Sequence, residues 1–160
     1  MFDCGMPTVD DRLFKLYYWI DFYRDATDPV PCNMPESMGL SVAISMFVDA
    51  SHGGNVKDRR IQTGVFIFIN KAPIHWYRKK QPSVDTSTFG SEFCVIKVGV
   101  EMVEALRYKL RMFGVPFDGA ANVFCDNEVV HKNTIMAEST LRKKHHSIDY
   151  HKCREAVATM

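Results

Sequence analysis

The stretch NVFCDNE, residues 122–128, begins like a buried strand and ends on polar residues. Three apolar residues, 123–125, directly precede Asp126 and Asn127, at the point where the chain would leave a core. Asp-Asn pairs are common in turns, so turn chemistry alone explains such an ending. The alternative is that the strand delivers a carboxylate to a functional site.

The segments before this stretch predict a sheet. Residues 41–50 (SVAISMFVDA) alternate apolar with smaller or polar side chains, which is typical of a strand. A second, apolar strand is predicted at 61–70 and a third strand at 74–80, with Lys-Ala-Pro (71–73) as the turn between them. The close spacing of the three strands and their short connections favour an antiparallel meander.

A long helix is predicted at 85–114, closed by Gly114. This helix joins the meander to a fourth strand at 120–126, which should therefore lie parallel to the first strand. A short helix after Asp126 and a basic helix at 147–158 complete the order βββαβαα. The predicted fold class is α/β, a layered mixed sheet with packed helices.

The first 40 residues differ from the rest of the chain. Residues 1–25 are rich in aromatic side chains and predict an arm with a short helix. The three prolines of 27–39 predict an irregular linker over residues 26–40. The sequence therefore divides into an arm and linker at 1–40 and a domain at 41–160.

Three acidic residues are predicted to meet at one edge of this domain. Asp49 ends the first strand and Asp126 ends the fourth, and parallel neighbours present their carboxyl ends at the same edge. Helical periodicity places Glu92 on the apolar stripe of the long helix that faces the sheet. The other members of that stripe are Ile96, Gly99, Val103, Leu106, Leu110 and Phe113.

Carboxylates that cluster without a basic partner repel one another and favour a hard divalent cation with oxygen ligands. Neither the histidines nor the cysteines have zinc spacing, so Mg²⁺ or Mn²⁺ is the expected cofactor. Taken singly, each acid is explained as an ordinary strand-end or helix-start residue. On one predicted edge, a metal site is the favoured interpretation.

Composition predicts an intracellular protein with no membrane segment. The net charge of the 160 residues is +1, so any nucleic-acid surface must be local. The five cysteines are odd in number and scattered, which favours reduced thiols. The N-terminus lacks the pattern of a signal peptide, and the longest apolar run (65–69) is too short to span a bilayer.

Several longer patterns follow one another in a fixed order. Residues 47–93 contain FVDASHGG, DRRIQTG, PIHWYRKKQ and TSTFGSEF, residues 123–128 read VFCDNE, and residues 143–157 read KKHHSIDYHKCREAV. In this order and spacing they resemble the ribonuclease H domain of copia-type retrotransposon polyproteins. The resemblance covers about residues 41–158, and the arm and linker resemble the connector that follows the polymerase in such polyproteins.

This resemblance implies a ribonuclease H-like fold and hydrolysis of the RNA strand of RNA–DNA hybrids with two Mg²⁺ ions. Asp49, Glu92 and Asp126 would be the catalytic, metal-binding carboxylates, and a reverse transcriptase domain of the same polyprotein would be an ancestral partner. The family has a fourth acid after the helix at 147–158, so we expect a truncated domain that lacks the last strand and helix and is weakly active or inactive. Asp149 is the nearest spare carboxylate, but it lies within that helix and is not assigned the role.

Two basic stretches are candidate contacts for the phosphates of a hybrid, although a solvated surface explains them equally well. Their members are Arg78, Lys79, Lys80, Arg142, Lys143 and Lys144. Two alternatives to the nuclease stay open: a catalytically dead nucleic-acid-binding module and a non-functional relic of a retroelement.

Overall fold

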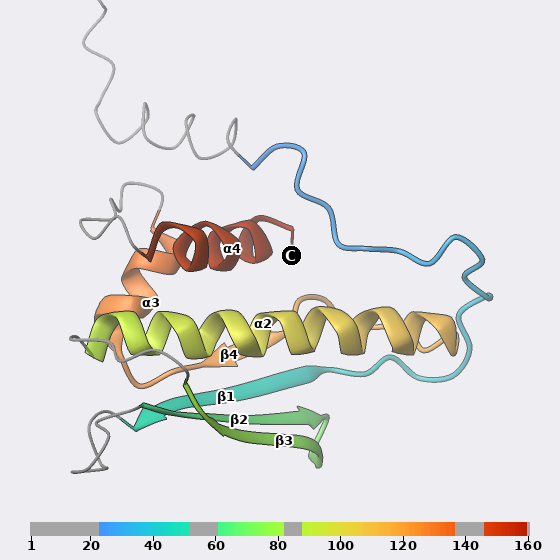
Figure 1. The fold of residues 1–160 in the computed structure, drawn as a ribbon. Coiled ribbons are helices and arrows are strands. Elements are labelled where there is room, and N and C mark those ends of the chain that lie inside the picture. Colours follow the sequence, from blue (N-terminus) through green and yellow to red (C-terminus); the bar gives the residue numbers. More distant parts are fainter. Residues whose placement is uncertain (1–22, 52–60, 82–87, 137–145, 160) are drawn as a thin grey trace, which may run out of the picture.

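The computed structural model describes residues 23–51, 61–81, 88–136 and 146–159, which form a mixed sheet with helices on one face (Figure 1). The strand order is β3-β2-β1-β4. This is the layered α/β arrangement predicted from the sequence, and it is compatible with a ribonuclease H-like fold. The described elements are, in chain order, β1 (Ile44–Ser51), β2 (Gln62–Ile69), β3 (Ala72–Lys80), α2 (Thr88–Met112), β4 (Asn122–Phe124), α3 (Glu128–Ile135) and α4 (Ser147–Ala158).

β1, β2 and β3 form the predicted antiparallel meander. The prediction of a Lys-Ala-Pro turn is wrong, because β3 already begins at Ala72 and the turn is Asn70-Lys71. Asn70 has a φ of +54°, in the left-handed region that asparagine tolerates. Its backbone N–H donates to the Ala43 carbonyl (2.8 Å) and its Oδ1 accepts from the Ala43 N–H (3.0 Å), which fixes the turn against the start of β1.

β4 lies parallel to β1, as predicted from the helical crossover, but it is short. Asn122–Phe124 pairs with residues 45–47, and the ladder then ends. β1 continues to Ser51, so within the described part of the chain residues 48–51 have β2 on one side and no β4 residue on the other. This early end of β4 leaves room beside β1 for a side chain from α2.

The core lies between the sheet and α2. Gly99 lets the helix approach β1 closely, since an added methyl group would overlap the Met46 side chain. Glu92 is buried on this side of the helix, as its position on the stripe predicts. The prediction that Phe113 belongs to the stripe is wrong, because α2 ends at Met112 and the Phe113 side chain is 76% exposed. The remaining members are buried or half-buried: Ile96, Gly99, Val103, Leu106 and Leu110.

A glycine closes the turn after α2, as predicted. Gly114 has a φ of +68°, and the N–H of Val115 donates to the Leu110 carbonyl at 3.0 Å, which satisfies a terminal carbonyl of the helix. The segment before β1 passes close to this turn, because the Met38 N–H donates to the Gly114 carbonyl at 2.7 Å. A Cβ added to Gly114 would lie 2.7 Å from the Glu36 carbonyl oxygen.

We expect Gly114→Ala to lower the free energy of unfolding by about 2–5 kcal/mol, through left-handed strain and overlap with the neighbouring backbone. Gly119 is the matched control, because its φ is +73° and nothing lies within 4 Å of an added Cβ. Gly119→Ala should lower the free energy of unfolding by about 1–2 kcal/mol, through left-handed strain alone. Urea denaturation measures both, and equal losses would show that the close approach at Gly114 contributes nothing.

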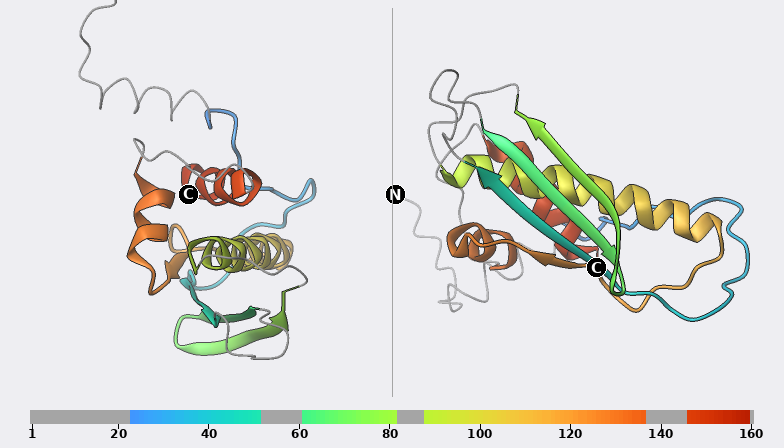
Figure 2. Two further views of the ribbon diagram at one scale, coloured as in Figure 1. Left: turned by 60° about the vertical axis from the view of Figure 1, so that its left-hand side comes forward. Right: turned by 90° about the horizontal axis from the view of Figure 1, so that it is seen from below.

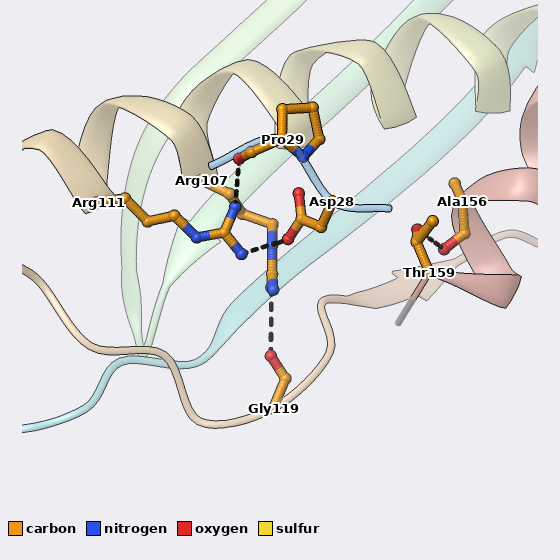
Figure 3. A network of polar contacts seen from close by, with 7 residues as sticks. All are labelled: Asp28, Pro29, Arg107, Arg111, Gly119, Ala156 and Thr159. Atoms are coloured by element: carbon orange, nitrogen blue, oxygen red, sulfur yellow. Dashed lines mark hydrogen bonds and ion pairs between the residues drawn. The ribbon is translucent and has the colours of Figure 1, made fainter. Parts of the chain in front are cut away.

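The segment that precedes β1 is held on α2 by an ion-pair network (Figure 3). Asp28 accepts from Arg107 Nε at 2.9 Å and forms an ion pair with Arg111. Arg111 also donates to the Pro29 carbonyl (2.8 Å), and Arg107 to the Gly119 carbonyl (3.2 Å). Burial alone would raise the pKa of Asp28, but the hydrogen bonds and charges of the two arginines lower it. The predicted linker thus makes specific contacts, while the predicted helix of the arm lies mainly in residues 1–22, outside the described part.

α4 packs on the side of α2 away from the sheet, and α3 lies beside both (Figure 2). Lys152 of α4 donates to Glu104 of α2 at 2.9 Å. α3 begins immediately after the turn at Asp126, and Asn127 caps it. None of the helices in the described ranges is long and apolar enough to cross a bilayer.

Candidate metal site and nucleic-acid surface

β1, α2 and the turn between β4 and α3 bring three carboxylates together. One carboxylate oxygen from each of Asp49, Glu92 and Asp126 lies within 4.8 Å of the other two. Asp49 and Asp126 are exposed, whereas Glu92 is only 6% exposed. The structure thus places side by side the three acids singled out in the sequence, whose role as metal ligands stays a prediction.

Two details of their placement differ from expectation. Asp49 was expected to end its strand, but β1 continues to Ser51. Asp126 was also expected at a strand end, but β4 ends at Phe124, so Asp126 lies in the turn that follows. Strand ends depend on cross-strand hydrogen bonds, which side-chain alternation in one segment does not reveal.

Glu92 is the buried member of the cluster. Its carboxylate accepts a hydrogen bond from the backbone of Ala50, in the part of β1 beyond the end of β4. Its Oε2 atom is buried and has no hydrogen-bond partner within the described residues. Burial first, and then the charges of Asp126 and Asp49, raise the pKa of Glu92 from 4.5 to about 7. A buried carboxylate oxygen of this kind is costly unless a donor or a cation binds it.

The donor set suits a hard cation. Carboxylate oxygens are the preferred ligands of Mg²⁺ and Mn²⁺. A bound cation also offsets the repulsion between carboxylates that lie close together. Cys125 lies near the cluster, but its thiol packs against the apolar core and burial raises its pKa. Among the described residues, the group of close ligand atoms consists of carboxylate oxygens and does not include this thiol. The residues present therefore fit Mg²⁺ or Mn²⁺ better than Zn²⁺.

Two further titratable residues, Asp149 and His151, already have partners. Asp149 lies 3.2 Å from the Lys97 ammonium, and this hydrogen bond raises the pKa of Lys97. His151 Nδ1 is 2.8 Å from the Tyr23 hydroxyl, which ties α4 to the segment before β1. The contact with Lys97 agrees with leaving Asp149 out of the predicted site.

The first basic stretch lies on β3, with its side chains on alternating sides. Lys80 pairs with Gln62, and the Arg78 guanidinium donates twice to Gln62 Oε1 (3.0 and 2.5 Å), so these two share the face away from α2. Lys79 pairs with the buried Thr63 and lies on the other side of the strand. All three basic residues are exposed. The second predicted stretch lies outside the described residues: Arg142, Lys143 and Lys144.

One surface was not predicted from the sequence. Phe124, Phe47, Phe66 and Trp76 come from four different strands and form one row across the outer face of the sheet. The sequence indicates this surface only through one aromatic residue at an outward-facing position of each strand. Aligning these positions needs the strand register, which is not visible within any single segment.

Sequence comparison relates the chain to a small part of two much longer proteins of Arabidopsis thaliana. The retrovirus-related Pol polyprotein from transposon RE2 is 25% identical over 121 residues, and that from transposon RE1 is 26% identical over 121 residues. Each match covers 74% of this chain, and the chain spans about 8% of the length of these curated relatives. No family model and no solved structure matches. The two matches support a retrotransposon Pol origin for this chain.

Proposed function

We propose that the chain is a retrotransposon-derived ribonuclease H-like domain that hydrolyses RNA in RNA–DNA hybrids with Mg²⁺ or Mn²⁺, at a weak rate. The carboxylate cluster carries this proposal, because its three acids lie within 4.8 Å and Glu92 has a buried oxygen without a partner. The ordered motifs and the similarity to Pol polyproteins support it. The proposal implies an intracellular site of action and a reverse transcriptase domain of the same polyprotein as the ancestral partner.

Asp49, Glu92 and Asp126 would hold the ions. Bound divalent ions supply positive charge at the scissile phosphate and a hydroxide nucleophile from water at neutral pH. The role of the protein in this chemistry is to hold three carboxylate oxygens close together. The pKa of Glu92 is about 7, so near neutral pH a bound cation would readily replace the proton on its carboxyl group.

Arg78, Lys79 and Lys80 would contact the phosphates of the hybrid, together with the predicted second stretch of Arg142, Lys143 and Lys144. Contacts of this kind release counterions, so the affinity for the hybrid should fall steeply as salt rises. The exposure of the three residues on β3 supports this assignment, although they lie on two sides of the strand.

Cleavage of an end-labelled RNA–DNA hybrid in Mg²⁺ and in Mn²⁺ tests the proposal. We expect slow cutting of the RNA strand, and a loss of at least about 100-fold in Asp126→Asn, because a metal ligand contributes several kcal/mol to the transition state. Asp118→Asn is the matched control, since Asp118 is exposed and lies outside the cluster. Folded wild-type protein that cuts in neither metal would overturn the hydrolytic function.

A second candidate is a nucleic-acid-binding module without cleavage. The resemblance implies four acids, whereas the described residues bring together three, and Asp149 is paired with Lys97. Such a module would bind the hybrid in EDTA, and binding would survive Asp49→Asn with no cleavage by either protein. The relic named above differs from both, because it would show no cooperative unfolding and no hybrid binding.

A further inference from the structure

The face of the sheet away from α2 carries an aromatic row of four side chains, one from each strand. The strand register pairs Phe47 with Phe124 and with Phe66, and it pairs Phe66 with Trp76. These side chains are 47–69% exposed, and Trp76 is the most exposed of them. In the described part of the chain the helices all lie on the opposite face (Figures 1 and 2). The row is therefore open to solvent.

A pocket lies directly beside the aromatic row. The next cross-strand row consists of Asp49, Gly64 and Arg78, and Gly64 has no side chain to fill the space between the other two. Phe66 and Trp76 complete the lining on the side of the aromatic row, and the pocket has a volume of about 440 Å³. Its outline is thus an aromatic wall, a backbone floor and one charged group at each end.

The charges of this face suit an anionic ligand at its β3 end. The guanidinium of Arg78 donates to the neutral amide oxygen of Gln62, and no ion pair among the described residues joins Arg78 to a carboxylate. Lys80 adds a second positive charge on the same face. Flat aromatic surface next to a cationic group is the arrangement by which proteins bind unpaired nucleotides.

We propose that this pocket binds an unpaired nucleotide of a single-stranded nucleic acid, with its base stacked on Trp76 and its phosphate at Arg78. Stacking needs a free face of the base, and in an RNA–DNA hybrid the bases already stack on one another. The pocket therefore favours a single strand over a duplex. The two basic residues also favour a polyanion over an apolar protein surface or a second copy of this chain.

This inference goes beyond hybrid hydrolysis and needs no metal ion. It is tested in EDTA by fluorescence anisotropy, with labelled short oligo(dT) and oligo(U) compared with an RNA–DNA hybrid of the same length. We expect Trp76→Ala to raise the Kd for the single strands about 5- to 100-fold, which is the range for one stacked base. The Kd for the hybrid should change less than twofold. Asp126→Asn removes a negative charge next to Asp49 and should not weaken single-strand binding, whereas it should abolish cleavage, which separates this inference from the proposed function.

Gly64→Val tests the shape of the pocket. A Cβ at Gly64 would meet only the Asp49 carbonyl oxygen, at an ordinary 3.5 Å, and valine suits a strand, so we expect the variant to fold. Its side chain would cover the backbone floor of the pocket between Asp49 and Arg78, so we expect it to weaken single-strand binding in the same direction as Trp76→Ala. Tyr108→Ala is the matched control, because Tyr108 is an exposed aromatic residue on α2, away from this face, and should leave the Kd unchanged.

Fluorescence gives a direct reading of stacking. The chain has two tryptophans, Trp19 and Trp76, so in a Trp19→Phe background the emission comes from Trp76 and should be quenched by oligo(dT). Three results would overturn the inference: single strands that bind no more tightly than the hybrid, a Kd for Trp76→Ala within twofold of wild type, or unquenched emission. Sedimentation that shows a dimer dissociated by Trp76→Ala would assign the face to a second copy instead.

Discussion

Replacing Glu92 by glutamine should make the metal-free protein more stable at pH 8, by about 3 kcal/mol, and should abolish hybrid cleavage. Glu92 is buried beside two other carboxylates, and its pKa is raised from 4.5 to about 7. The ionised form is therefore disfavoured in the folded state. Glutamine keeps the size and shape of the side chain and removes that charge.

The pH dependence of this effect has a definite sign. In the folded protein Glu92 binds its proton more tightly than in the unfolded chain, so the unfolded chain has lost this proton by pH 7 while the folded protein still holds much of it. The contribution of Glu92 is full below pH 4.5 and is lost as the pH rises to about 7 and above. The wild type should lose stability over this window relative to Glu92→Gln, and urea denaturation at several pH values measures the difference.

A divalent metal ion should make the wild type more stable than Glu92→Gln, the reverse of the order expected without metal. A cation that binds the folded state stabilises it in proportion to the logarithm of its concentration over Kd, and Glu92→Gln should lose most of that gain. Glu101→Gln is the matched control, because Glu101 is an exposed glutamate of the same helix. The free energy of unfolding of Glu101→Gln should equal that of the wild type with and without Mg²⁺. Equal stability of wild type and Glu92→Gln across the pH range, or equal stabilisation by Mg²⁺, would contradict the buried-ligand account.

Arg154→Ala should destabilise the protein by about 3–4 kcal/mol, because Arg154 is only 4% exposed and joins several elements. Its Nη1 atom donates to the carbonyls of Asn133 and Met136 and to the Tyr150 hydroxyl, at 2.8–3.0 Å. The first two acceptors lie at the end of α3, and Tyr150 belongs to α4. Removing the guanidinium takes this donor away from two half-buried carbonyls and from the buried Tyr150 hydroxyl, and it removes the hydrogen bonds that join the two helices.

Arg154→Lys should recover little of this loss, since a single ammonium on a flexible stem does not reproduce the planar fork of a guanidinium. Glu155→Gln, a change at an exposed neighbour on the same helix, should alter stability by less than about 0.5 kcal/mol. Thermal and urea unfolding followed by circular dichroism measure all three variants. A loss below 1 kcal/mol in Arg154→Ala would show that the hydrogen bonds to α3 are replaced by water.

Much of the fold was predictable because its signals are local. The alternation of 41–50 and the glycine at 114 each reflect a preference of the backbone or side chains in one segment. The parallel pairing of β4 followed from its connection through α2. The positions of Asp49, Glu92 and Asp126 at one edge followed from the same topology and needed no distance information.

The rest depends on contacts between distant segments. The hydrogen bond from Ala50 to Glu92 exists because β4 stops at Phe124, and the length of β4 is set by its pairing with β1. The ion pairs of Asp28 join residues about 80 positions apart, and no pattern around Asp28 indicates them. The aromatic row likewise needs the register of three strand pairs. Such features are properties of the assembled sheet and helices.

The shortness of β4 divides the carboxylate site between two parts of unequal stability. Asp126 lies beyond the three-residue ladder, and its position depends on α3, whose first turn is held by the Asn127 side chain through the N–H groups of Val129 and Val130 (3.1 and 3.2 Å). A helix of about two turns opens locally far more often than a core strand. In native-state hydrogen exchange, Asp126 would therefore belong to a fast-opening unit and Asp49 to a slow one. Changes at the Asn127 cap of α3 would then alter the affinity of the site for a cation through the position of Asp126, while Asp49 stays fixed in β1.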